Sequence, residues 1–229
     1  MILMGIFSLY GLRSATPEEE RTADRVEQWC RLAEEGEMTM TDLLAQATSP
    51  VYEGSVLLMH RMIDSNDEPI SIEALRMPSF LSAILLGVFF FIFVCRERSR
   101  SIARVTLFFL IATPFLHFFI ITGGSGVPGA LFGTLALMVC HDVMVSDRKH
   151  PAGSILTCGL LLALAGLSVG SGGVVIPSLA ILLWGLMGRR STGKTRLWMP
   201  ITSILLGVLL IALAAIIPGE CHWLTQESG

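Results

Sequence analysis

Acidic side chains are nearly missing from the second part of this chain. Between residues 79 and 217 the carboxylates are Glu97, Asp142 and Asp147. That stretch holds no Glu-x-x-His pair and no ladder of carboxylates, which argues against a di-metal centre and against a recognisable transporter core. The chain has five cysteines, and they are scattered without the Cys-x-x-Cys spacing of a zinc site. From these absences we expect no metal site, no cofactor and no enzymatic activity.

Long apolar runs fill the same part of the chain. Hydrophobic residues make up 52% of the sequence, and the mean hydropathy is +0.67. A helix that crosses a bilayer needs about 20 mostly apolar residues, and backbone groups in lipid are satisfied within helices. The expected fold class is therefore all-α, a polytopic transmembrane helix bundle over residues 79–217. Six spans are predicted, at 79–95, 102–122, 127–145, 152–169, 174–188 and 197–217.

Positive charges gather in three loops between these spans. The remaining connections, 123–126 and 170–173, carry no charge. Because Lys and Arg are retained on the cytoplasmic side, the alternation predicts that residues 16–78 and the tail 218–229 are extracytoplasmic. We expect an integral protein of the plasma or inner membrane, or of host endomembranes if the chain is viral. The residues predicted to set this topology are Arg96, Arg98, Arg100, Arg104, Arg148, Lys149, Arg189, Arg190, Lys194 and Arg196.

Residues 16–78 have the opposite charge, with 14 acidic and 5 basic side chains. An acidic surface repels phosphate, so nucleic acid is not an expected partner. Before this region lies the apolar segment 1–15, which is interpreted as a signal peptide, a signal anchor or a short seventh span. Each of these alternatives delivers residues 16–78 to the outside.

Capping and turn residues divide the acidic region into short helices. Thr16-Pro17 is typical of a helix start, and Gly36 is predicted to stop that helix. A second helix is expected around 42–47, ended by Ser49-Pro50, and the apolar stretch 56–63 is interpreted as helical or extended. So small a region is marginal on its own. We therefore expect it to rest on the membrane surface, on the helix bundle or on a partner.

Small residues recur at four-residue intervals in the third and fourth predicted spans. Such a stripe lets two helix backbones approach closely, which is how helices associate in lipid. The pattern predicts helix-packing contacts, either within the bundle or between copies of the chain. The residues concerned are Gly129, Gly133, Gly159, Ala163, Gly166 and Gly170.

One ionisable side chain is predicted deep in the membrane. His117 follows Pro114 by three residues. A proline frees a backbone carbonyl, and an ionisable group beside it is an arrangement found along ion or proton paths. A transport or channel component that uses the polar positions around His117 is one alternative function.

A nucleotide-binding pattern is present in the last basic loop. Residues 188–195 match the pattern Gly-x-x-x-x-Gly-Lys-Thr. That motif binds phosphate when a strand precedes it and a helix follows it in an α/β sheet. A membrane-spanning run precedes it here, so Lys194 is interpreted as a charge that anchors two helices.

A second motif resembles the rhomboid intramembrane proteases. It consists of Gly123-Gly124-Ser125-Gly126 at the start of a span, and the layout of a long first loop followed by six helices is also similar. The resemblance implies Ser125 as nucleophile and a histidine on the helix after next as base. The helix at 174–188 has no histidine, and His141 stands about 24 Å along the same helix as Ser125. An unassisted serine is a weak nucleophile, so an inactive homologue is implied.

The function expected from these patterns is that of a scaffold, an assembly factor or a subunit of a membrane complex that acts through helix packing. Its expected partners are the lipid bilayer and another membrane protein or a second copy of the chain. Besides the transport and rhomboid-like alternatives, a viral origin stays open. An acidic lead region, a span and a basic turn such as 96–104 are similar in layout to membrane-spanning nonstructural proteins of flavivirus-like polyproteins. This implies a product cut from a viral polyprotein.

Overall fold

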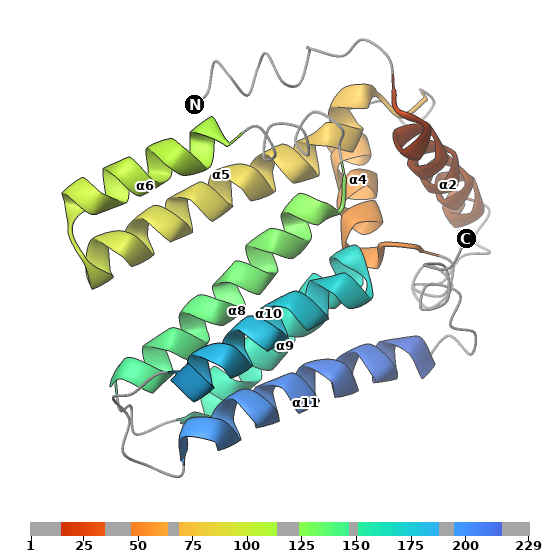
Figure 1. Ribbon diagram of the computed structural model, residues 1–229. Coiled ribbons are helices and arrows are strands. Elements are labelled where there is room, and N and C mark those ends of the chain that lie inside the picture. Colours follow the sequence, from red (N-terminus) through yellow and green to blue (C-terminus); the bar gives the residue numbers. More distant parts are fainter. Residues whose placement is uncertain are drawn as a thin grey trace. The chain divides into compact units, whose positions relative to one another are not determined.

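The computed structural model describes residues 15–34, 47–63, 69–113, 124–146, 151–187 and 195–216. These residues form eight α-helices and contain no strand (Figure 1). The all-α prediction is therefore confirmed for this part of the chain.

The chain divides into two compact units. The first consists of Met1–Leu43 and Ser49–Pro128, and the second of Leu44–Thr48 and Gly129–Gly229. Each unit is considered by itself.

The first unit contains α2 (Pro17–Glu34), α4 (Pro50–Ile63), α5 (Ile72–Glu97) and α6 (Arg100–Ala112). Helix α2 begins at the predicted position because Thr16 and Glu19 form a reciprocal capping box. The amide of Glu19 donates to Thr16 Oγ1 at 3.2 Å, and the amide of Thr16 donates to Glu19 Oε2 at 2.7 Å. Val26 and Trp29 form the buried face of α2.

Ser49-Pro50 was expected to end a helix around 42–47, and this stays a prediction because the residues before Ala47 lie outside the described part. Pro50 is the first residue of the next helix, α4. Proline suits this position because its fixed φ fits the helix and its missing amide proton is not needed there. The amide of Glu53 donates to the carbonyl of Ser49 at 2.9 Å. The helix expected at 42–47 lies outside the described residues, apart from Ala47.

Helices α5 and α6 form a hairpin (Figure 1). Helix α5 begins at Ile72, ahead of the expected span start at Ser79, because Ser71 Oγ accepts from the amide of Ala74 at 3.1 Å and caps the helix there. Helix α6 begins after a similar cap, where Ser99 Oγ accepts from the amide of Ile102 at 3.3 Å. It covers the first half of the expected span 102–122, and residues 114–122 lie outside the described part.

The second unit is built from α8 (Gly126–Ser146), α9 (Pro151–Val169), α10 (Ser171–Met187) and α11 (Thr195–Ile216); the first residues of α8 belong to the first unit. Its buried core takes Ala136 and Cys140 from α8, Cys158 and Leu162 from α9, and Ile181 from α10. No charged side chain is among these core residues. This composition suits helices that pack in lipid.

Three of the described helices are long and apolar enough to cross a membrane. They cover Ile72–Glu97, Gly126–Met144 and Ala152–Val169. Two shorter apolar stretches, Gly172–Leu183 and Ile201–Ala214, belong to α10 and α11. The described part of the chain thus supports a helical protein with membrane-spanning segments.

Candidate functional site

The predicted helix-packing glycines of α8 and the first of α9 lie against side chains of neighbouring helices. A Cβ atom at Gly129 would overlap the side chain of Val169. One at Gly133 would lie 2.7 Å from Cγ of Pro177 on α10, and one at Gly159 would lie 2.9 Å from Cδ2 of Leu206 on α11. At distances under 3.0 Å an added methyl group would force a neighbouring atom to shift, so glycine allows these helices to approach closely.

The second half of α9 repeats the arrangement. A Cβ at Gly166 would lie 2.6 Å from Ile211 of α11 and from Val174 of α10. Gly170 has a different role, because its φ of 78° turns the chain from α9 directly into α10. Its amide donates to the carbonyl of Gly166 at 2.7 Å, which closes the end of α9. Ala163 is buried on the same helix.

Two glycines outside the predicted set also pack closely. A Cβ at Gly207 of α11 would lie 3.0 Å from Cβ of Leu162 and 3.2 Å from the carbonyl oxygen of Gly159. One at Gly173 would overlap the backbone of Ala165. The signal for Gly207 was present in the sequence, because Ser203 and Gly207 form a small-xxx-small pair, and both are buried.

The order of these contacts defines the arrangement of the second unit. Gly159 meets Leu206 and Gly166 meets Ile211, so α9 and α11 run in the same direction along their contact. Each close approach joins two helices of one chain. The small residues are therefore occupied by packing within the chain, although the sequence pattern alone allowed contacts between copies.

A buried polar cluster occupies the first unit where α2, α4 and α5 meet. Arg76 of α5 donates from Nε to Glu19 Oε1 at 2.7 Å and from an Nη atom to Oε2 at 3.2 Å, and both side chains are fully buried. Tyr52 of α4 donates from its hydroxyl to the carbonyl of Leu75 at 2.8 Å. Burial, followed by the negative charge of Glu19, raises the pKa of Tyr52 well above its ordinary value. The phenol is therefore held in its protonated, donating form.

Two further contacts join the same helices at the edge of this cluster. Arg25 of α2 forms an ion pair of 2.8 Å with Glu53 of α4, a carboxylate that is almost fully buried. Glu27 of α2 accepts from the amide of Ile70, just before α5, at 3.3 Å. The sequence identified the acidic character of this region but not the helix positions that its charges would join.

Of the ten residues predicted to set the topology, the structure describes only some. Arg96, Arg98, Arg100 and Arg104 are exposed at the turn of the α5–α6 hairpin. Arg196 lies in the first turn of α11. The remaining five, Arg148, Lys149, Arg189, Arg190 and Lys194, lie outside the described residues, as does His117.

Ser125, the serine of the rhomboid-like motif, lies in the turn before α8. The carbonyl of the preceding residue, Gly124, accepts a hydrogen bond of 2.8 Å from the hydroxyl of Ser79 on α5. Phe80 of α5 packs nearby against Ala83 and Val127. This contact fastens the start of α8 to α5, which is a structural role for the turn.

No protein-family model matches the sequence, and neither a curated protein nor a solved structure matches the chain.

Proposed function

We propose that this chain is a six-span membrane protein that acts as a scaffold, an assembly factor or a subunit of a membrane complex. The three long apolar helices support membrane insertion. In the proposed topology, spans at 102–122, 174–188 and 197–217 complete the bundle. Residues 16–78 and 218–229 are proposed to be extracytoplasmic, and the arginines of the α5–α6 turn cytoplasmic.

The observation that carries this proposal is the buried ion pair between Glu19 and Arg76. It joins α2 to the first turns of α5, a helix long and apolar enough to cross the bilayer. A buried charged pair adds little stability compared with apolar packing, and its proposed role here is to select one arrangement of α2 on α5 over others. A region held in one orientation on a membrane helix suits a protein that positions a partner.

The exposed side of α2 is the surface proposed to meet that partner. Glu18, Glu20 and Asp24 are exposed there, whereas Glu19 and Trp29 face inward. Since the small residues of α8 and α9 are occupied by helices of the same chain, they are not proposed to bind the partner. A membrane protein with a basic extracytoplasmic surface fits this side of α2.

Co-purification from native membranes in mild detergent tests the proposal. The tagged chain is expected to retain a membrane-protein partner, and the variant with Glu18→Gln, Glu20→Gln and Asp24→Asn is expected to release it. The variant with Arg21→Gln and Arg31→Gln, which changes exposed basic residues of the same helix, is the matched control. Differently tagged copies show whether the partner is a second copy. Solute flux through the pure chain in proteoliposomes would favour the transport alternative instead.

The topology is tested separately with single cysteines in a background whose native cysteines are replaced by serine or alanine. An impermeant maleimide is expected to label Asp24→Cys from outside and to label Arg100→Cys only after the membrane is opened. Labelling of both residues from the same side would contradict the proposed orientation.

A further inference from the structure

We propose that the α5–α6 hairpin holds an anionic phospholipid, with the lipid phosphate on Arg98, Arg100 and Arg104 and the acyl chains against the exposed apolar face of α6. The inference rests on the membrane insertion of α5 and α6 and does not depend on the partner proposed above.

The first arginine of the α5–α6 turn, Arg96, is paired with a carboxylate. Arg96 donates to Glu97 Oε1 from two nitrogens, each at 3.2 Å, and lies over the ring of Phe93 with its Cζ 5.6 Å from the ring centre. Glu97 is the only carboxylate in residues 79–113. Its charge is therefore countered within the turn by Arg96.

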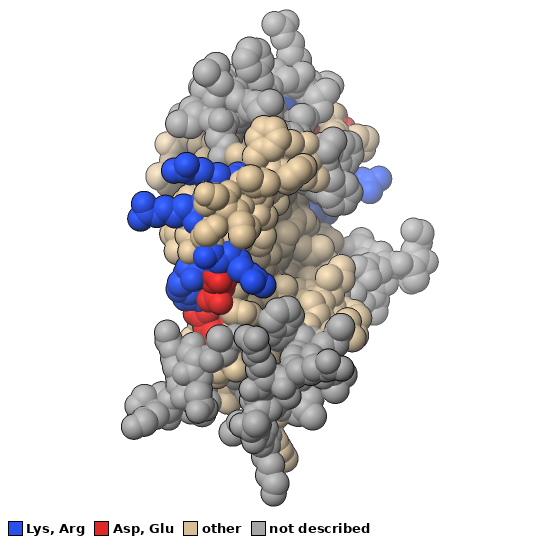
Figure 2. All heavy atoms as spheres, turned by 60° about the vertical axis from the view of Figure 1, so that its left-hand side comes forward, with Lys and Arg blue, Asp and Glu red and all other residues tan. Residues whose placement is uncertain are grey.

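Arg98, Arg100 and Arg104 keep their positive charge available. All three are exposed, and within the described residues none of them forms an ion pair. Arg98 and Arg100 flank Ser99, and Arg104 follows Arg100 one helical turn later, so the three lie together at the hairpin end. Figure 2 shows basic side chains gathered on the face where this end comes forward. Three clustered guanidinium groups attract an anionic group.

The position of these arginines at the start of α6 makes the local electrostatic potential more positive. Arg100 is the first residue of α6, and the first turn of α6 contains no acidic residue. The start of a helix carries a partial positive charge, so a cation there opposes the dipole instead of complementing it. An anion bound at the turn would relieve this repulsion.

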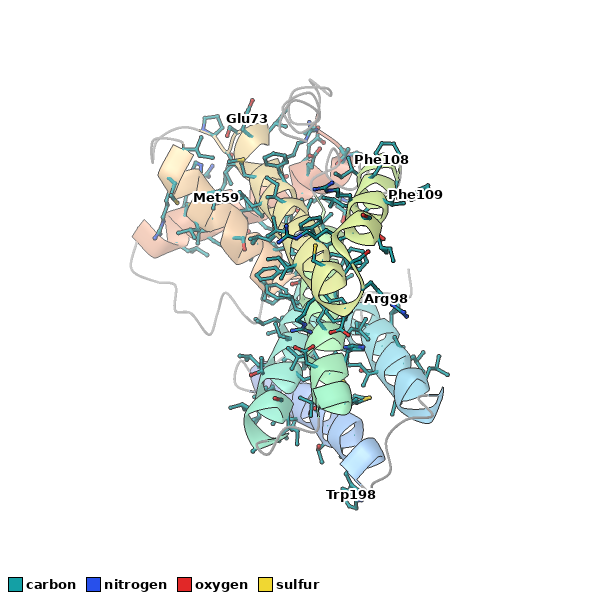
Figure 3. The ribbon with its side chains drawn as sticks, turned by 90° about the vertical axis from the view of Figure 1, so that its left-hand side faces the viewer. Met59, Glu73, Arg98, Phe108, Phe109 and Trp198 are labelled. Carbon is teal, nitrogen blue, oxygen red and sulfur yellow. The ribbon has the colours of Figure 1, made fainter. Side chains whose placement is uncertain are left out.

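After Arg104 the exposed residues of α6 are apolar. Ile102, Val105, Phe108 and Phe109 are all exposed, and the two phenylalanines are 67% and 65% accessible. Their rings form an edge-to-face pair with centroids 6.1 Å apart. Figure 3 shows both rings projecting outward from α6, with Arg98 near the hairpin end. Phe108 follows Arg104 by four residues, about 6 Å along the helix axis.

A charged end joined to an apolar face matches one class of ligand. Inorganic phosphate would use the arginines but leave the apolar face uncovered. A nucleic acid would bring phosphate but no chains to cover Phe108 and Phe109. A phospholipid supplies both, and clusters of basic residues directly beside a spanning helix are typical sites for anionic headgroups.

The test measures which lipids remain with the full chain. The protein is placed in nanodiscs of phosphatidylcholine with a minor share of phosphatidylglycerol, and the lipids that stay bound on release are counted by native mass spectrometry. The variant with Arg98→Gln, Arg100→Gln and Arg104→Gln is expected to lose the preference for phosphatidylglycerol by roughly 100-fold, because each basic residue near an anionic surface contributes about a fivefold preference and the three factors multiply. The same positions changed to lysine are expected to retain most of it.

The control removes three exposed arginines from the acidic region, through Arg21→Gln, Arg31→Gln and Arg61→Gln. An equal loss in this control, or no loss in the hairpin variant, would overturn the proposed site. Displacement of the lipid by inorganic phosphate would overturn the choice of a lipid as the ligand.

The circular dichroism of every variant is measured in the same nanodiscs. The lysine variant keeps the inference testable if the glutamine variant does not fold. Failure to find a protein partner would leave the lipid result unchanged, so the two proposals fail separately.

Discussion

The carboxylate of Glu19 joins two structural elements at once. It closes the capping box of α2 through the amide of Thr16 and forms a buried, two-point ion pair with Arg76 of α5. The start of α2 and its attachment to α5 therefore depend on one side chain. Since both partners are fully buried, removal of either leaves the other charge without its counter-ion in a low-dielectric site.

Arg76→Met is expected to destabilise the first unit by about 3–5 kcal/mol, the usual cost of leaving one partner of a buried pair unpaired. The fluorescence of Trp29, which is 2% exposed, reports the unfolding when the other three tryptophans are phenylalanine. The double variant Glu19→Gln with Arg76→Met should cost less than the sum of the single variants. Additive costs would mean that the two residues do not interact.

Tyr52 is expected to titrate only when the first unit unfolds. The folded state holds the phenolic proton more tightly than the unfolded chain, so the stabilisation is present below about pH 10 and is lost as the pH rises above it. The chain has two tyrosines, so in the Tyr10→Phe variant the tyrosinate absorbance comes from Tyr52 alone. That absorbance should rise together with the loss of helical circular dichroism. A rise near pH 10 in the folded protein would contradict the buried hydrogen bond to Leu75.

Tyr52→Phe provides the complementary measurement. The variant should lose about 1 kcal/mol at neutral pH, because the carbonyl of Leu75 loses its donor. Above pH 10 its stability should fall less steeply than that of the native chain, since the group that ionises is gone. Chemical denaturation at neutral and alkaline pH measures both effects, and an unchanged alkaline slope would assign the loss to another group.

Gly133→Ala is expected to destabilise the second unit by about 1–3 kcal/mol, because the added methyl group meets the rigid ring of Pro177 and the helices must move apart. Gly153→Ala is the matched control, since nothing lies within 4 Å of its Cβ position. The control should be neutral or slightly stabilising, as alanine favours a helix over glycine. Thermal unfolding in detergent compares the two, and equal melting temperatures would contradict the close contact between α8 and α10.

Gly170→Ala should cost about 1–2 kcal/mol through backbone strain at a φ of 78°. Gly170→Asn should cost less, because asparagine tolerates this region of backbone space better than alanine. The same thermal unfolding assay ranks the two variants. A reversed order would show that the turn between α9 and α10 relaxes when the glycine is replaced.

Much of the helical architecture could be predicted from local signals. Thr16 and Glu19 mark the start of α2 because a capping box involves only neighbouring residues. Ser49-Pro50 was interpreted as the end of one helix and not as the start of α4, because proline is compatible both with the residues after a helix and with the first residue of one. The span start at Ser79 was placed by hydropathy, whereas Ser71 caps α5 earlier through a hydrogen bond that hydropathy does not detect.

In the candidate sites too, some features could be predicted from local spacing and others only from the tertiary structure. The small residues of α8 and α9 were evident from their spacing. Gly207 on α11 was missed although Ser203 and Gly207 have the same spacing, and its contacts with Leu162 and Gly159 appear only in the tertiary structure. No rule of spacing connects Glu19 with Arg76, which are 57 residues apart.

By itself the sequence determined that the described chain is helical and contains segments able to cross a membrane, because apolar runs and caps act over one or two turns. The tertiary structure decided which surfaces those helices use. It placed the glycine stripes against helices of the same chain and the acidic region against the start of α5. It also left the arginines of the α5–α6 turn exposed beside an apolar face. Such choices depend on contacts between residues far apart in the chain, where side-chain shape and charge must match in three dimensions.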